Sequence, residues 1–153
     1  MNLDLIYEKL YSAYGPQFWW PAETFDEIII GTILTQNTSW LNVEKAILNL
    51  KKAEFCNLDK IAKMEFQTLA ELIKPSGYFN QKAKRLINLA LTLDIENIKK
   101  ADIWDARREL LSINGVGPET ADSMLLYAFQ KPIFVIDAYT IRVISRVFGD
   151  TER

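Results

Sequence analysis

The sequence predicts an all-α protein. Apolar residues recur at helical spacing along the whole chain, and Gly, Pro or capping residues separate these segments. Residues 131–136, Lys-Pro-Ile-Phe-Val-Ile, instead predict an extended segment. The chain has 153 residues, 49% hydrophobic and 25% charged, so it has the composition of a globular protein with room for one domain or two small lobes.

Apolar stripes and caps predict each helix in turn. Before residue 75 we expect five helices. The first covers residues 3–13 and is ended by Gly15-Pro16, and the second covers 24–34 and is opened by the capping box Thr24-Phe25-Asp26-Glu27. The third covers 38–52 and is capped by Thr38, a short fourth helix begins at Asn57, and the fifth covers 65–73. After the turn Pro75-Ser76-Gly77 we expect four more helices. They cover residues 80–93; 102–112, capped by Asp102; 118–129, opened by Pro118; and 138–148, ended by Gly149.

The most informative segment is 111–121, Leu-Ser-Ile-Asn-Gly-Val-Gly-Pro-Glu-Thr-Ala. Gly115 and Gly117 permit positive φ and close approach of another molecule, and Pro118 suits the first turn of a helix. The amides of such a turn lie at the positive end of the helix dipole, where a phosphate fits. A glycine-capped corner is the alternative, but apolar residues at helical spacing on both sides favour a helix-hairpin-helix unit.

This hairpin, with Asp137 20 residues after Gly117, resembles the signature of the endonuclease III superfamily (HhH-GPD) of DNA glycosylases. The resemblance covers essentially the whole chain. Residues 18–21, Phe-Trp-Trp-Pro, and residues 75–85 resemble most the bacterial 3-methyladenine DNA glycosylase III branch.

That resemblance implies a helix-hairpin-helix glycosylase fold with two helical lobes and a cleft between them. Residues 23–133 would form the lobe that contains the hairpin, and residues 1–22 and 134–153 would belong to the second lobe. We expect this second lobe to be incomplete and the chain truncated, because family members continue for several more helices.

The resemblance assigns the catalytic role to Asp137. Breaking an N-glycosidic bond leaves positive charge on the sugar, which a fixed carboxylate stabilises while it activates water. From the local sequence alone, N-capping of the last helix is the alternative. Bifunctional members carry a lysine at the position of Glu119, whose amine forms a Schiff base. Since a carboxylate forms no imine, we expect a monofunctional N-glycosylase without AP-lyase activity.

The resemblance also places Trp20, Pro21, Trp40 and Glu119 in a base pocket. A base methylated at a ring nitrogen carries positive charge, which an indole face attracts. Alkylated purines such as 3-methyladenine are therefore the expected substrates. Core packing is the alternative for the tryptophans, and we expect it for Trp19; a favourable charge in a helix's first turn is the alternative for Glu119.

Extruding a base from duplex DNA leaves a gap. The resemblance gives the role of filling it to Gln36 and Asn37, which lie between the second and third helices and could equally be caps. The expected DNA-binding residues are Gln36, Asn37, Gly115, Val116, Gly117 and Thr120. The family also suggests a structural Na⁺ or K⁺ held by main-chain oxygens of Leu111, Ile113 and Val116.

Charge gives weaker guidance. Lys and Arg number 18 against 20 Asp and Glu, a net charge of −2, whereas DNA-binding proteins are usually more basic. Two clusters, Lys82-Lys84-Arg85 and Arg107-Arg108, could supply local positive charge, with a solvated helix face as the alternative. We therefore expect modest, salt-sensitive affinity for DNA.

Composition excludes several classes of site. The chain has no histidine, which removes His-dependent catalysis and His-ligated zinc. Its one cysteine, Cys56, excludes an intrachain disulfide. In the family, the four cysteines of an iron–sulfur cluster lie beyond the position of Arg153, so we expect no such cluster in this chain and no required cofactor.

The expected partner is double-stranded DNA that contains a damaged base, with no membrane. The chain has no apolar run of about 20 residues and no signal-peptide pattern, so we expect a cytoplasmic, nucleoid-associated monomer of a bacterial cell. Two other functions stay open: a glycosylase for oxidised or mispaired bases, and a non-catalytic helix-hairpin-helix module that binds DNA.

Overall fold

The computed structural model describes residues 2–149, which divide into two compact units. Unit 1 comprises the described residues up to Pro21 and from Ile136 onward, and unit 2 is Ala22–Val135. All regular elements of residues 2–149 are helical, which confirms the predicted all-α class. Within these residues no helix combines the length and the apolar character needed to cross a membrane.

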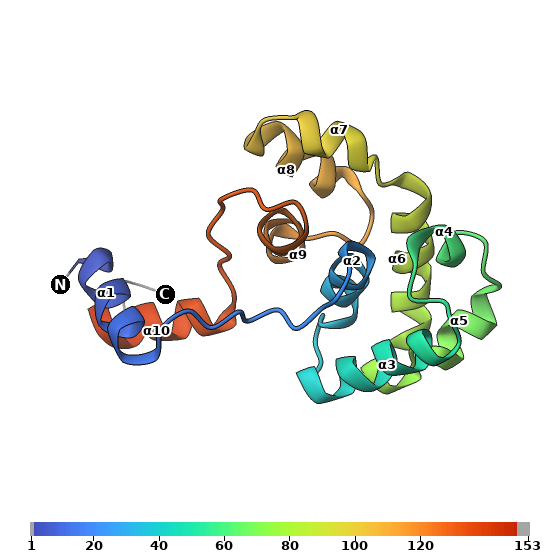
Figure 1. Ribbon diagram of the computed structural model, residues 1–153, viewed down its shortest axis with the longest axis horizontal. Coiled ribbons are helices and arrows are strands. Elements are labelled where there is room, and N and C mark those ends of the chain that lie inside the picture. Colours follow the sequence, from blue (N-terminus) through green and yellow to red (C-terminus); the bar gives the residue numbers. More distant parts are fainter. Residues whose placement is uncertain (1, 150–153) are drawn as a thin grey trace. The chain divides into compact units, whose positions relative to one another are not determined.

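The helices follow the chain in the order drawn in Figure 1. Unit 1 contains α1 (Leu3–Tyr14) and α10 (Ala138–Phe148). Unit 2 contains α2 (Phe25–Leu34), α3 (Trp40–Lys52), α4 (Leu58–Ile61), α5 (Phe66–Leu72), the 3₁₀ turn η1 (Lys74–Ser76), α6 (Phe79–Thr92), α7 (Ile95–Lys100), α8 (Ile103–Ser112), α9 (Pro118–Ser123) and the π-helical turn η2 (Met124–Ala128).

Helix α2 forms the centre of unit 2. Seven of its ten residues are buried, and it packs against α3, α6, α9 and η2. Among residues 2–149, every fully buried side chain belongs to unit 2, whereas neither α1 nor α10 contains a buried residue. The hydrophobic core of the described residues, which carries the hairpin between α8 and α9, is therefore the core of unit 2.

Most predicted caps are confirmed. The side chains of Thr24, Asn57, Asp102 and Asp137 each accept a hydrogen bond from a first-turn amide of the helix that follows. Each bond satisfies an N–H group that has no partner within the helix. Local chemistry thus sets where four of the helices begin.

The observed helices differ from the prediction in three places. Thr38 caps no helix, because the chain first makes a turn in which Asn37 has φ +52°, and α3 begins at Trp40 after Ser39. Helix α7, with Asp94 as its cap, was not predicted, since six residues are too few for a periodic pattern. The helix expected over 118–129 changes to π geometry after Ser123, where Phe129 N–H bonds to the Met124 carbonyl at 3.0 Å.

Lys82 joins the end of α2 to the turn before α6. Its side chain is 1% exposed, and Nζ donates to the carbonyls of Leu34, at 2.8 Å, and Ser76, at 2.7 Å. Lys82 is therefore a buried bridge between two turns and no part of a surface cluster, contrary to the sequence-based expectation. Burial, with a smaller contribution from the nearby Arg85 guanidinium, lowers the pKa of Lys82 to about 8.

We predict that Lys82 makes stability rise with pH between about 8 and 10.5. In that window the unfolded chain binds the lysine proton and the folded chain has released it, so the cost of burying the charge disappears as pH increases. A pKa lowered to about 8 corresponds to at most about 3 kcal/mol over the window. Urea unfolding across this range measures the gain, and Lys82→Met should flatten the slope. An identical slope in the variant would contradict the assignment.

Candidate functional site

The predicted hairpin is present between α8 and α9. Gly115 has φ +95°, and the turn is closed by a 3.1 Å bond from Val116 N–H to the Ile113 carbonyl. Pro118 begins α9, preceded by Gly117, which has no side chain to cap the first-turn amides. Val116 is buried, so its side chain packs into the core and is not presented at the surface.

Gln36 connects the α2–α3 turn to this hairpin. Its Nε2 donates to the Gly115 carbonyl at 3.1 Å and to Thr120 Oγ1 at 3.0 Å, and its Oε1 accepts a hydrogen bond from Arg85 Nη1. Gln36 is therefore in direct contact with Gly115 and Thr120, two residues of a distant segment that were also predicted to bind DNA. Thr120 is buried, and its hydroxyl serves this contact.

Asn37 is an exposed residue of the α2–α3 turn. Its backbone is left-handed, with φ +52°, a conformation that asparagine adopts more readily than most residues. The turn thus directs Gln36 inward to the hairpin and leaves Asn37 accessible.

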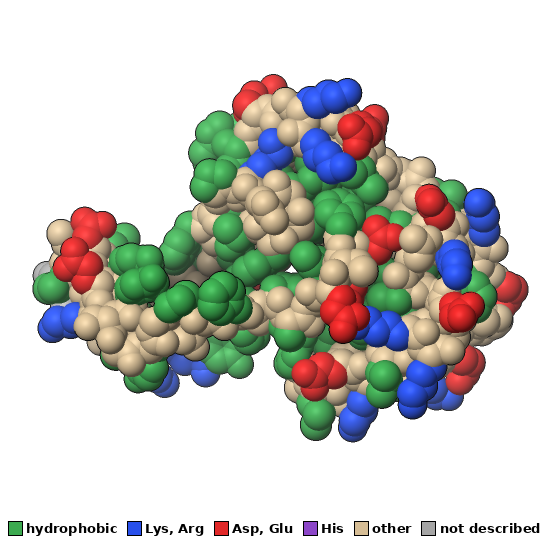
Figure 2. All heavy atoms as spheres, in the orientation of Figure 1, with side chains coloured by type: hydrophobic (Ala, Val, Ile, Leu, Met, Phe, Trp, Pro, Cys, Tyr) green, Lys and Arg blue, Asp and Glu red, His purple; other side chains and the backbone are tan. Residues whose placement is uncertain are grey.

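The two basic clusters are not free positive patches. Arg107 forms a two-pronged ion pair with the buried Asp122, at 2.6 and 3.1 Å, which holds its pKa above the usual value. Arg108 pairs with Asp105, and Lys84 lies 6.0 Å from the ring centre of Phe66. Figure 2 shows basic and acidic side chains interspersed over the visible face of unit 2. The expectation of two local basic surfaces is thus largely wrong.

Asp137 lies in unit 1, where it caps α10. Its Oδ1 accepts a 2.7 Å hydrogen bond from Thr140 N–H, and the carboxylate is half-buried. The preceding residues 131–136 are not helical, in line with the predicted extended segment. Capping, the alternative function of Asp137, is therefore present, while a catalytic role stays a prediction.

The four residues of the predicted base pocket come from both units. Trp20 is half-buried and Pro21 exposed in unit 1, whereas Trp40 begins α3 and Glu119 is exposed in the first turn of α9. Trp40 Nε1 donates to Glu44 Oε1 at 2.9 Å. Their assembly into one pocket stays a prediction.

Trp19 was expected in the core, and that expectation is wrong. Its side chain is 59% exposed, and neighbouring Phe18 is 89% exposed. The physical reason is that these residues belong to unit 1, which has no buried side chain among its described residues for them to join.

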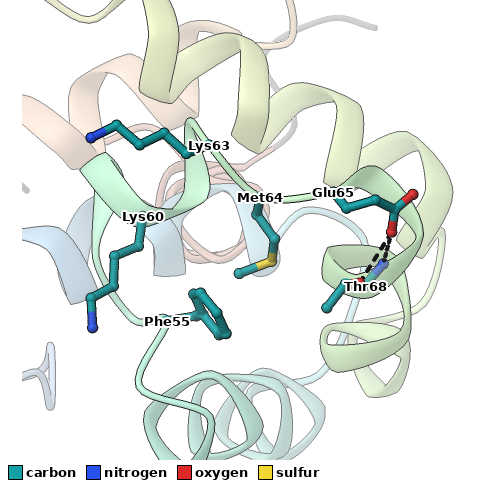
Figure 3. Close-up of a pocket in the computed structure, with 6 residues that line it drawn as sticks. All are labelled: Phe55, Lys60, Lys63, Met64, Glu65 and Thr68. Atoms are coloured by element: carbon teal, nitrogen blue, oxygen red, sulfur yellow. Dashed lines mark hydrogen bonds between the residues drawn. The ribbon is translucent and has the colours of Figure 1, made fainter.

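A pocket of about 420 Å³ lies elsewhere on unit 2 and contains none of the predicted site residues. Its lining residues are Phe55, Lys60, Lys63, Met64, Glu65 and Thr68. Figure 3 shows Phe55 and Met64 pointing toward each other while the two lysines extend away, and Lys60 Nζ is bonded to the Glu54 carbonyl at 2.7 Å. The Glu65 carboxylate accepts hydrogen bonds from the Thr68 amide and hydroxyl, so it serves the cap of α5.

Comparison with known proteins decides the family. The sequence profile of the HhH-GPD superfamily of base excision DNA repair proteins matches residues 30–153. The chain belongs to this superfamily. A Methanocaldococcus jannaschii protein, provisionally named a DNA repair glycosylase, is 51% identical over 93% of this chain and 68% of its own length. Endonuclease III of Thermotoga maritima is 33% identical over 78% of this chain and 55% of its own length.

Solved structures agree with this membership. The Helicobacter pylori 3-methyladenine DNA glycosylase bound to 1,N6-ethenoadenine matches with a TM-score of 0.81 and 36% identity, over 99% of this chain and 74% of that one. An endonuclease III–DNA complex matches the fold with a TM-score of 0.78 at 20% identity, over 97% of this chain and 71% of that one. The predicted superfamily and the predicted fold are confirmed.

We predict that Gly115→Ala destabilises unit 2 by about 2 kcal/mol, because alanine is strained at positive φ. The new methyl group would also lie 2.5 Å from Arg85 Cγ. Gly117→Ala is the matched control, since Gly117 has φ −94° and no atom within 4 Å of a Cβ. Urea unfolding of the two variants measures the difference. Equal stabilities of the two variants would show that the close approach of Arg85 to Gly115 does not stabilise unit 2.

Proposed function

We propose that this protein is a monofunctional DNA glycosylase that hydrolyses the N-glycosidic bond of alkylated purines such as 3-methyladenine. The observation that carries the proposal is the 36% identity, over 99% of this chain, to a 3-methyladenine DNA glycosylase whose structure contains a modified adenine. Membership of a base-excision repair superfamily supplies the reaction class.

In this proposal the hairpin holds the DNA backbone. Main-chain amides near Gly115 and Gly117 bind a phosphate, and carbonyl oxygens of Leu111, Ile113 and Val116 bind a monovalent cation beside it. The Ile113 carbonyl already accepts one hydrogen bond and keeps a second lone pair, so this donor set is compatible with Na⁺ or K⁺. That ion would neutralise charge where the strand meets the protein.

The flipped base would be recognised by Trp20, Pro21, Trp40 and Glu119. Indole faces and a carboxylate favour a cationic purine over a neutral one. Such a base also leaves its sugar easily, so recognition can carry much of the selectivity. Gln36 and Asn37 would occupy the gap in the duplex.

Asp137 would stabilise the positive charge that develops on the sugar and orient the attacking water. Its capping bond to Thr140 suits this role, because it fixes the carboxylate on the first turn of α10. Glu119 offers no amine for covalent attack, so the sugar–phosphate strand would stay intact.

A second substrate class has its own support. The 33% identity to an endonuclease III supports oxidised or mispaired bases as the alternative substrates. A set of duplexes, each with one lesion, separates the two classes by the rate of base release.

We predict that Asp137→Asn lowers release of 3-methyladenine from methylated DNA by at least about 100-fold. Asparagine caps a helix as well as aspartate does, so this substitution removes the charge and keeps the cap. Release of free base, followed by alkaline cleavage at abasic sites, measures activity. Asp102→Asn, at the cap of α8, is the matched control and should keep full activity. An active Asp137→Asn variant would contradict the assigned role.

We predict that borohydride traps no covalent complex between this protein and lesion-containing DNA. Only an imine between an amine and the sugar is reduced to a stable adduct, and the position of the family's lysine is Glu119. Denaturing gel electrophoresis detects the adduct, with a bifunctional glycosylase run as the positive control. A trapped band with this protein would show that another amine attacks and that the enzyme is bifunctional.

A further inference from the structure

The Arg85 side chain contacts both the hairpin and the α2–α3 turn. It comes from α6, one helical turn after the buried Lys82, and it is half-buried. Its Cγ and Cδ cover Gly115 so closely that a Cβ on the glycine would lie 2.5 and 2.9 Å from them. Its Nη1 donates to Gln36 Oε1. One side chain therefore touches both the hairpin and the α2–α3 turn.

These contacts fix the orientation of the Gln36 amide. With Oε1 held by Arg85, the NH₂ group must face Gly115 O and Thr120 Oγ1, and it bonds to both. A hydrogen bond from a guanidinium is stronger than one between neutral groups. Without it the Gln36 amide can rotate, and the turn that carries Asn37 loses this hydrogen bond to α6.

We propose that Arg85 is a positioning residue that acts through Gln36. It holds the α2–α3 turn against the phosphate-binding hairpin. The hairpin that would bind the DNA strand and the turn that would fill the gap are thereby held in one fixed arrangement. The inference rests on the proposed function, because it assumes that Gln36 and Asn37 meet a duplex from which a base has been removed. Because the turn is already ordered in the free protein, less conformational entropy is lost when the protein binds a duplex from which a base has been removed.

A direct contact between Arg85 and a DNA phosphate is the competing role. The geometry favours positioning, because the guanidinium is directed at Gln36, whereas the adjacent Lys84 extends over Phe66. The two roles differ in what they affect. A phosphate contact strengthens binding to every duplex and contributes to its salt dependence, whereas a positioning contact matters only where the gap is present.

The test compares binding to two duplexes, one undamaged and one with a stable abasic analogue, for wild type and Arg85→Met. Methionine keeps side-chain cover over Gly115 and removes the donor. We expect Arg85→Met to bind the abasic duplex about tenfold more weakly than wild type, because one charge-assisted hydrogen bond is lost. Its affinity for undamaged DNA should stay within about twofold of the wild-type value. Lys84→Met, which removes the same charge one residue away, is the reference for a purely electrostatic effect.

A double-mutant cycle with Gln36→Ala gives the second readout. If Arg85 acts through Gln36, the double variant should bind the abasic duplex no more weakly than Gln36→Ala alone. Thr120→Val loosens Gln36 from its other side and should give the same selective loss, so the test does not depend on how well Arg85→Met folds.

Other outcomes overturn the proposal. Equal losses on both duplexes, with a salt slope lower by about one, would make Arg85 a phosphate contact. If Arg85→Met binds both duplexes as wild type does, or if the effects of the two substitutions are additive in the cycle, Arg85 has no positioning role. If wild type itself fails to prefer the abasic duplex and releases no base, the proposed function fails, and that result is distinct from a failure of Arg85 alone.

Discussion

The close approach of the Arg85 side chain to Gly115 is the contact on which the candidate DNA-facing part of unit 2 depends. The hairpin must carry glycine there for two reasons, the positive φ and the 2.5 Å that would separate a Cβ from Arg85 Cγ. Because the chain meets both conditions, α6 can lie directly beneath the hairpin. Asn88, one turn further along α6, adds a bond to the Asn114 carbonyl at 3.3 Å.

Helix α6 therefore acts as the frame for two turns that are distant in sequence. Lys82 bonds to the last carbonyl of α2 and to the carbonyl of Ser76, while Arg85 bonds to Gln36 two residues beyond α2. Both cationic side chains donate their hydrogen bonds to uncharged oxygen atoms. A buried cation with such partners costs less than an unpaired one and specifies one arrangement of the backbone around it.

The sequence was informative where a structural choice is made locally. Caps such as Thr24 and Asp102 were predictable because a short polar side chain bonds to amides two or three residues away. The hairpin was predictable because Gly-x-Gly-Pro has few other conformations. Thr38 misled for the converse reason, since a left-handed residue at Asn37 delays the start of α3.

The fate of long side chains was not predictable in this way. Lysine and arginine reach about 6 Å, so tertiary neighbours decide whether they face water or the interior. One signal was present: Lys82 stands four and seven residues before Leu86 and Leu89, on the buried stripe of α6. Trp19 shows the reverse error, because an aromatic residue is buried only where neighbouring elements provide a core.

These internal uses of charge bear on how the protein would hold DNA. Lys82, Arg85 and Arg107 are bonded within the protein, and the net charge is −2, so long-range attraction to a polyanion is weak. In the proposed function the grip would then come largely from main-chain dipoles at the hairpin, which act only at contact distance. Dipoles release fewer counterions than lysines do, so such binding varies less with salt than that of a basic protein. Recognition would depend on shape at the site of damage more than on attraction along the duplex.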